Sequence, residues 1–139
     1  MNILKVLTRS RKIGNIGEDI AAAYLKKKGY KILERNYDDG EFEIDIIAEN
    51  KTALIFVEVK TRTRTHEHSS ETSPSSAVTP EKQRRIIKSA NLYLSARRAK
   101  KDIRLDIIEV FLNEDTSENE THHIENAFNL NTAYENRRY

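Results

Sequence analysis

The sequence predicts an α/β fold of the α+β type, in which two helices accompany four to five strands within one domain. Three observations lead to this class: an alanine-rich helical pattern that stops at a glycine, two apolar runs joined by a short polar turn, and a Thr-Pro-Glu helix start that lies between strand-like segments. The chain has 139 residues, which is enough for one core but too few for two domains of ordinary size. We therefore expect a single domain over residues 1–139.

Composition narrows the function classes. The formal net charge is only +2 although there are 24 Lys and Arg residues, so any affinity for nucleic acid must depend on where those residues lie. The chain has no cysteine, which excludes a disulfide, a thiolate nucleophile and a sulfur-rich zinc site and fits a reducing compartment. No apolar run has the length of a signal peptide core or a membrane span. We expect a cytoplasmic protein with no membrane partner.

The first helix is expected over residues 15–28. Alanines at positions 21 to 23 favour it, and Gly29 is a typical residue beyond a last helical turn. Glu18 follows Asn15 by three residues, the spacing of a capping box, in which the glutamate carboxylate accepts a hydrogen bond from the Asn15 amide. Residues 30–37 then alternate as a first strand, and an Asp-Asp-Gly turn follows them.

Two apolar runs on either side of residues 49–52 are expected to pair as an antiparallel hairpin. With the turn centred on Asn50 and Lys51, Ile44 pairs with Val57. One face is then wholly apolar and needs a covering element; it consists of Ile44, Ile46, Ala48, Ile55, Val57 and Val59. The opposite face is charged away from the turn and carries Glu43, Asp45, Ile47, Leu54, Phe56, Glu58 and Lys60.

The charged end of this face has the residues of a metal-dependent hydrolase. In the expected register Asp45 is diagonal to Glu58, with Cβ atoms roughly 6–8 Å apart, close enough to share one divalent cation. Lys60 lies on the same face because it follows Glu58 by two residues. The carboxylates would hold Mg²⁺ or Mn²⁺, and the lysine would orient the water that attacks a phosphodiester or steady the developing charge. An ion pair between Lys60 and either carboxylate is the alternative.

The second half of the chain is expected to begin with a mobile loop over residues 61–79, which are rich in Ser and Thr. A helix should follow from Pro80 to about Arg98, because Thr79 is a good cap and proline suits the first helical position. Residues 104–112 are expected to form a strand and 121–124 a short last one. The tail, 129–139, has no clear element.

Basic residues near the loop are candidates for contact with nucleic acid. Arg62 and Arg64 lie at the base of the loop, and Lys82 and Arg85 lie in the first turns of the second helix, where phosphate contact and an ordinary solvated helix face are both open. Asp106 is expected to be structural. The four histidines do not form a complete ligand set in the sequence, and we expect exposed or capping roles for them.

An ordered series of motifs runs through nearly the whole chain: Gly14, Gly17-Glu18, Gly29-Tyr30, Arg35-Asn36, Glu43-Ile44-Asp45, Phe56-Val57-Glu58-Val59-Lys60-Thr61-Arg62, Ala77-Val78, Lys82, Asp106 and Asn126-Ala127-Phe128. This series resembles the bacterial YraN-like family, which is similar to the PD-(D/E)xK restriction-endonuclease-like superfamily that includes archaeal Holliday-junction resolvases. It covers a core of about 14–128 and is far more specific than Glu-x-Lys alone. One departure is Phe42, where the family usually has glycine.

The resemblance implies a restriction-endonuclease-like core in the order α-β-β-β-α-β, with a mixed sheet flanked by helices. It implies Asp45 and Glu58 as metal ligands, Lys60 as the catalytic lysine and Glu18 as a contribution from the first helix. The expected function is Mg²⁺- or Mn²⁺-dependent hydrolysis of DNA, with branched or damaged DNA as the substrate, by a chain that could act as a homodimer. The alternative is a non-catalytic nucleic-acid-binding or adaptor module on the same fold.

Overall fold

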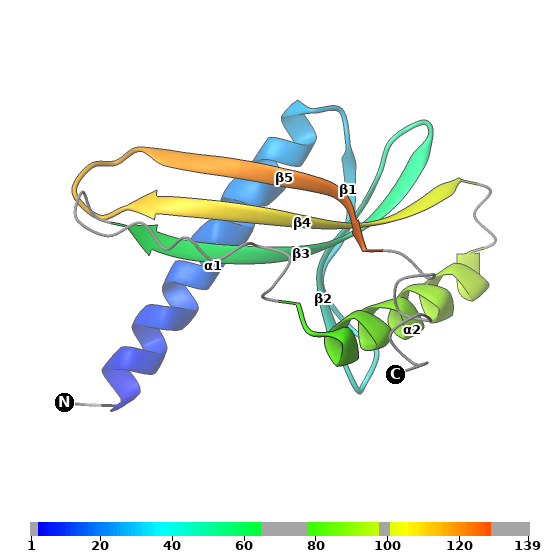
Figure 1. Cartoon of the computed structure of the whole chain (residues 1–139), viewed down its shortest axis with the longest axis horizontal. Coiled ribbons are helices and arrows are strands. Elements are labelled where there is room, and N and C mark those ends of the chain that lie inside the picture. Colours follow the sequence, from blue (N-terminus) through cyan, green and yellow to red (C-terminus); the bar gives the residue numbers. More distant parts are fainter. Residues whose placement is uncertain (1–2, 65–77, 98–100, 129–139) are drawn as a thin grey trace.

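The computed structural model describes residues 3–64, 78–97 and 101–128 (Figure 1). Two helices and five strands follow one another in the order α1 (Ile3–Lys27), β1 (Lys31–Asp38), β2 (Glu43–Glu49), β3 (Ala53–Arg64), α2 (Pro80–Arg97), β4 (Asp102–Asn113) and β5 (Asn119–Phe128). The predicted order of helices and strands is confirmed. The tail 129–139 and most of the expected loop, 65–77, lie outside the described residues.

One mixed sheet holds the five strands in the order β1-β2-β3-β4-β5. All neighbours are antiparallel except β3 and β4, which run parallel over their full length. A parallel pair needs a crossover connection, and α2 lies within it. The structure therefore confirms a mixed α+β architecture with a five-stranded sheet flanked by helices.

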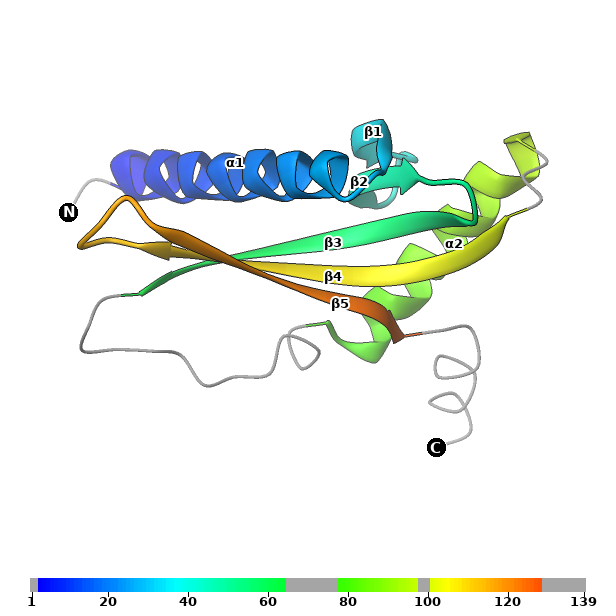
Figure 2. The same cartoon turned by 90° about the horizontal axis from the view of Figure 1, so that it is seen from above.

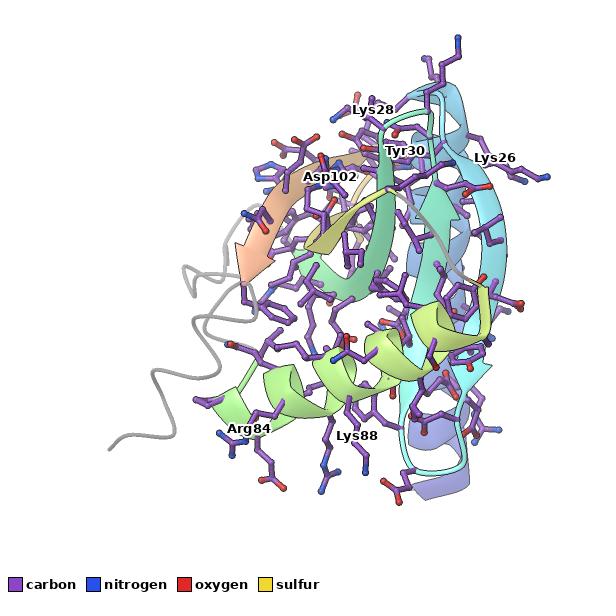
Figure 3. All side chains as sticks on the ribbon, turned by 90° about the vertical axis from the view of Figure 1, so that its right-hand side faces the viewer. Lys26, Lys28, Tyr30, Arg84, Lys88 and Asp102 are labelled. Carbon is purple, nitrogen blue, oxygen red and sulfur yellow. The ribbon has the colours of Figure 1, made fainter. Side chains whose placement is uncertain are left out.

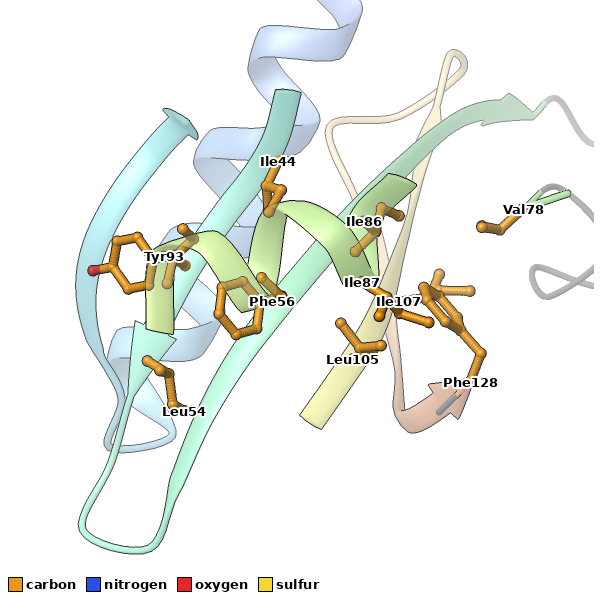
Figure 4. Packing of buried hydrophobic residues seen from close by; sticks show 12 residues of the cluster. Ile44, Leu54, Phe56, Val78, Ile86, Ile87, Tyr93, Leu105, Ile107 and Phe128 are labelled. Carbon is orange, nitrogen blue, oxygen red and sulfur yellow. The ribbon is translucent and has the colours of Figure 1, made fainter. Parts of the chain in front are cut away.

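Each face of the sheet is covered by one helix, and each interface is a separate apolar cluster. On the α1 face, Ala21, Ala22 and Leu25 pack against strand residues that include Ile55 and Ile108. Figure 2 shows α1 lying along this side of the sheet. On the other face, α2 residues pack against β2, β3 and β4, and Figure 4 shows the cluster around Ile44, Phe56, Ile86, Tyr93 and Ile107.

Helix α1 begins at Ile3, twelve residues before the predicted start. The predicted capping box at Asn15 and Glu18 is therefore wrong, since both residues lie inside the helix. Gly14 and Gly17 have low helix propensity and hide the continuity in the sequence. Tertiary contacts override that propensity. Gly17 is buried against β3, and a Cβ atom at this position would overlap with Thr61 of that strand.

The hairpin of β2 and β3 forms with a register that differs by two residues from the predicted one. Ile46 pairs with Val57, and Glu49 pairs with Leu54, so the prediction that Ile44 pairs with Val57 is wrong. The turn decides this shift because the Asn50 side chain accepts hydrogen bonds from the amides of Thr52 and Ala53, at 3.0 and 2.8 Å, which makes residues 51 and 52 the tip.

A shift of two residues preserves which side chains share a face. Ile46, Ala48, Ile55, Val57 and Val59 all belong to the α1 cluster, as expected for the apolar face. Ile44 is the exception, because it packs in the α2 cluster. The expected charged face is also more covered than predicted: Ile47, Leu54 and Phe56 are buried under α2.

Three strands are longer than predicted. Strand β3 continues to Arg64, so residues 61–64 are paired with β4 and do not belong to a loop. Strand β4 begins at Asp102, and β5 runs from Asn119 to Phe128, much longer than the predicted 121–124. Sheet pairing extends these strands into polar sequence, where side-chain pattern gives little signal.

Neither helix in the described part of the chain has the length and apolar character needed to cross a membrane.

Candidate functional site

The four predicted site residues come from three elements and gather at one place. Glu18 lies in α1, Asp45 in β2, and Glu58 and Lys60 in β3. The three carboxylates line one cavity of about 390 Å³, whose walls are Ile13, Gly14, Glu18, Asp45, Glu58, Val59, Thr61 and Thr63. The cavity lies where β2 separates from β3, since their pairing ends at Ile46 and Val57 whereas β3 continues alongside β4.

Asp45 occupies the point of separation. Its register position places it opposite Glu58, but instead of continuing the ladder its Oδ2 atom accepts a hydrogen bond from the Val59 amide at 2.8 Å. Burial and, after it, the neighbouring charge of Glu58 raise the pKa of Asp45 to about 7, although the hydrogen bond from the Val59 amide acts in the opposite direction. The sheet therefore holds a carboxylate where two other carboxylates disfavour its charge.

Glu58 is the most buried of the three, with 7% of its side chain exposed. Two ammonium groups approach the same oxygen: Nζ of Lys82 lies 2.6 Å from Oε1, and Nζ of Lys60 lies 3.4 Å from it. Lys60 is thus beside Glu58 as the i, i+2 spacing predicts. Lys82 comes from the first turn of α2 on the other side of the sheet.

Glu18 reaches the cavity from the middle of α1. In the amide orientation that satisfies its hydrogen bonds, the side chain of Asn36 donates to Glu18 Oε2 at 3.1 Å and to Glu43 Oε1 at 3.0 Å. Burial raises the pKa of Glu18, and the guanidinium of Arg35, 3.9 Å away, opposes this. Asn36 has a φ of 51°, a left-handed conformation that asparagine tolerates better than most residues.

Close packing of α1 on β3 brings Glu18 to the two strand carboxylates. A Cβ atom added to Gly17 would lie 1.8 Å from Oγ1 of Thr61, so only glycine allows the helix this close to the strand. Thr61 itself lines the cavity. Gly17 therefore allows α1 to approach β3 closely, and the next residue, Glu18, places its carboxylate in the cavity.

The four predicted nucleic-acid contacts are dispersed. Arg62 pairs with the buried Glu109 at 3.2 Å, and Arg64 pairs with Glu120 while its guanidinium lies over the Phe111 ring. Arg85 is exposed and pairs with Glu81 within α2 at 3.0 Å. Lys82 is the member of this group that reaches the carboxylates.

Oxygen donors such as these suit Mg²⁺ or Mn²⁺ better than softer metals. Asp45, Glu58 and Glu18 share one cavity, and the raised pKa of Asp45 marks a place where a cation would relieve repulsion between carboxylates. The donor set therefore fits such an ion. As the side chains stand, however, no three His, Asp or Glu residues within the described ranges form a group able to hold a metal.

Sequence reasoning missed the contact between Lys82 and Glu58 and the contact of Asn36 with Glu18. Neither pair has a local signal, because 24 residues separate the first pair and 18 the second in the sequence. Lys82 and Asn36 do occur in the motif series, which marks them without indicating their partners.

Comparison with known proteins gives one consistent result. The model of the "Uncharacterised protein family UPF0102" matches residues 17–110. A UPF0102 protein of Caldanaerobacter subterraneus subsp. tengcongensis is 47% identical over 118 residues, covering 84% of this chain and 93% of that protein. Those of Clostridium botulinum strain Loch Maree and Clostridium beijerinckii are 45% and 41% identical, covering 87% and 88% of this chain and 97% of each relative.

Among solved structures, Pyrococcus furiosus SfsA in complex with Ca²⁺ aligns with 84% of this chain and 63% of that chain, at 19% identity. Its TM-score of 0.33 is too low to establish a shared fold. The family match covers the first-helix, hairpin and second-helix motifs together, and it agrees with the resemblance found in the sequence. The chain therefore belongs to the UPF0102 family, the YraN-like family that its motifs resemble.

Proposed function

We propose that this protein is a metal-dependent nuclease that hydrolyses phosphodiester bonds of DNA, with branched or damaged DNA as its substrate. The observation that carries the proposal is the convergence of Glu18, Asp45 and Glu58 on one cavity, with the Lys60 ammonium beside Glu58. The order of helices and strands is also the one expected of the PD-(D/E)xK superfamily. On this proposal the fold is a restriction-endonuclease-like core.

Each side chain has a distinct task in the proposed reaction. Asp45 and Glu58 would hold Mg²⁺ or Mn²⁺ with Glu18 as a third ligand, and the bound ion would polarise the phosphate and acidify a water. Lys60 would orient the attacking water or offset charge that develops on the phosphate. The Val59 amide fixes the Asp45 carboxylate, so one ligand is preorganised by the backbone.

Cleavage assays test the proposal. The wild type should cut at least one member of a panel of linear, single-stranded, flap and four-way-junction DNAs when Mg²⁺ or Mn²⁺ is present, and not in EDTA. Asp45→Ala and Lys60→Ala should each reduce the rate by about 10²-fold or more. Asp19→Ala is the matched control, because Asp19 neighbours Glu18 in the chain but is 68% exposed and pairs with Arg35. Equal cleavage by wild type and both site variants contradicts the assigned roles.

One observation favours a second candidate, a non-catalytic nucleic-acid-binding or adaptor module. Two lysine ammonium groups, those of Lys60 and Lys82, already pair with Glu58. Such pairs would neutralise the carboxylate in a protein whose site no longer binds a metal. This candidate predicts salt-sensitive DNA binding without turnover, and Asp45→Ala should leave the affinity unchanged or improve it by removing repulsion from phosphate. Filter binding at two or more salt concentrations, combined with the cleavage assay on the same DNAs, separates the two candidates, because only the nuclease cuts the DNA that it binds.

A further inference from the structure

The contact between Lys82 and Glu58 is the shortest ion pair at the candidate site. Its Nζ to Oε1 distance of 2.6 Å compares with 3.4 Å for Lys60, although Lys60 is on the same strand as Glu58. The glutamate side chain is 7% exposed and the lysine side chain 31% exposed. A lysine from another element therefore occupies an oxygen that the proposed function needs for a metal ion.

The backbone of Lys82 is fixed, so its approach to Glu58 is built into the fold. Thr79 caps α2 by accepting from the Lys82 amide at 3.2 Å, and the Gln83 side chain donates to the carbonyl of Val78 at 3.0 Å. Val78 is buried in the α2 cluster and anchors this turn. From a fixed Cα, the long lysine side chain can still leave Glu58 without moving the helix.

The neighbouring basic side chains of α2 that the structure describes do not contact the buried carboxylates as Lys82 does. Arg84 and Lys88 point away from the sheet (Figure 3), and Lys88 pairs with the exposed Glu41 at 3.2 Å. Arg85 pairs with Glu81 on the helix surface. Lys82 is thus distinguished from its neighbours by a buried partner, and Lys88 provides a matched lysine on the same helix.

The carboxylates around the cavity explain the role of the Lys82 ammonium beside Glu58. Three carboxylates line one cavity, and an ammonium on Glu58 offsets part of their repulsion. A divalent ion between Asp45 and Glu58 would offset more of it and would repel the ammonium at the same oxygen. The ion pair and the metal are therefore alternatives for the same oxygen of Glu58.

We propose that Lys82 competes with the divalent cation for the Glu58 carboxylate, so that metal entry releases the lysine ammonium from Glu58. The inference rests on the proposed function and deepens it, because it assigns Lys82 a positioning role at the metal site. The released ammonium stays at the edge of the site, tethered to the first turn of α2. There it is available to a phosphate, which links metal loading to substrate binding.

The test measures Mn²⁺ affinity without DNA, by calorimetry and by the electron paramagnetic resonance signal of free Mn²⁺. Lys82→Met keeps most of the length of the side chain and removes the charge. This variant should bind Mn²⁺ about tenfold more tightly than wild type, as expected when a competing pair of about 1.4 kcal/mol is lost. Lys88→Met should match the wild type. Lys82→Arg keeps the charge and should show none of the gain.

Folding is checked separately, because Glu58 loses a partner in Lys82→Met. Far-ultraviolet circular dichroism and tyrosine fluorescence establish that each variant is folded. In the wild type, added Mg²⁺ should also shift the Lys82 side-chain nitrogen resonance toward that of a solvated lysine, a measurement that needs no destabilised variant.

The outcomes distinguish the two proposals. If wild type and Lys82→Met bind Mn²⁺ with equal affinity, the proposed competition is overturned. If Asp45→Asn abolishes that binding at the same time, the proposed metal site still stands. Weaker binding by Lys82→Met, or an unshifted Lys82 resonance at saturating Mg²⁺, also overturns the competition. Absence of Mn²⁺ binding in both the wild type and Lys82→Met overturns the proposed function and the competition together.

Discussion

At the scale of single residues, Asp45 is held in an environment that disfavours its charge. Burial and the neighbouring Glu58 raise its pKa to about 7, against an ordinary value of 3.8. A carboxyl whose pKa is raised by folding binds a proton in the folded state over a pH range where the unfolded chain has lost it. The contribution of Asp45 to the free energy of unfolding should therefore fall as the pH rises from about 4 to about 7, and the loss should persist at higher pH.

Asp45→Asn should consequently stabilise the metal-free protein. In EDTA at pH 8 we expect a gain of about 1–3 kcal/mol in the free energy of unfolding, and at pH 4 a difference near zero. The amide oxygen of asparagine can still accept from Val59. Urea unfolding at both pH values measures the effect, with the exposed Asp19→Asn as control. A variant that is less stable than wild type at pH 8 contradicts the electrostatic reason.

Asp106 is a buried carboxylate with the opposite behaviour. Its side chain is fully buried, yet it accepts hydrogen bonds from Arg104 Nε and the Asn126 amide, both at 2.9 Å, and lies 2.7 Å from His123 Nε2. Burial raises the pKa of Asp106, but these donors outweigh it, and the pKa is lowered below its ordinary value. The cluster ties β4 to β5. The exposed or capping role predicted for His123 is wrong, because its side chain is only 2% exposed and contacts the buried Asp106.

Asp106→Asn should destabilise the protein by about 2–4 kcal/mol at pH 7, because it leaves buried donors poorly paired. A lowered folded-state pKa means that the contribution of Asp106 is fully present above the unfolded-state value near 4 and is lost as the pH falls through the folded-state value. The difference in the free energy of unfolding between wild type and Asp106→Asn should therefore become smaller below pH 4. Chemical unfolding from pH 3 to 7 measures it, and Asp102→Asn, an exposed change, should stay within about 0.5 kcal/mol of wild type.

At the scale of elements, the position of α1 depends on its contact with β3. Gly17 lies against Thr61, and Glu18 follows it into the cavity. A helix displaced from this contact would carry Glu18 away from Asp45 and Glu58. The helix that supplies the third carboxylate is thus positioned by a residue that has no side chain.

Gly17→Ala should lower the free energy of unfolding by about 1–3 kcal/mol, because the added Cβ would overlap with Thr61. Gly14→Ala is the matched control, since a Cβ at Gly14 meets nothing within 4 Å and alanine should stabilise the helix there by up to about 1 kcal/mol. Thermal and urea unfolding compare the two. Combination with Thr61→Ala should recover part of the Gly17→Ala loss, and strict additivity of the two changes would falsify the steric account.

At the scale of the whole molecule, both apolar clusters share the same three strands. Ile55 and Ile108 face α1, whereas Phe56 and Ile107 face α2, so neighbouring residues on β3 and β4 belong to different clusters. Neither helix can lose its packing without exposing one face of the same sheet. This arrangement favours one cooperative unit for the residues that the structure describes.

Leu25→Ala tests that cooperativity. Leu25 of α1 is fully buried against the sheet, and its truncation should cost about 2–5 kcal/mol. Tyr93, which packs in the opposite cluster, contributes to the tyrosine fluorescence, while circular dichroism reports the whole backbone. Both signals should shift together to one lower midpoint in urea. Two separate midpoints would show that the faces unfold independently.

Local pattern by itself determined much of this protein. The order of helices and strands, the hairpin and the capped start of α2 all follow from apolar periodicity and turn residues, which act within a few positions of the chain. Glu58 and Lys60 share a face for the same local reason. Only the motif series predicted that Glu18 belongs to the candidate site, because the local sequence around it indicated a helix cap.

Tertiary structure decided the rest. The hairpin register depends on the Asn50 turn. The continuation of α1 through Gly17 depends on the packing of that glycine against Thr61. The pairing of Lys82 with Glu58 joins residues 24 positions apart on different elements, and no local pattern encodes such a contact. Side-chain periodicity reports which face of an element is buried, whereas the partner on that face is fixed only when the elements pack together.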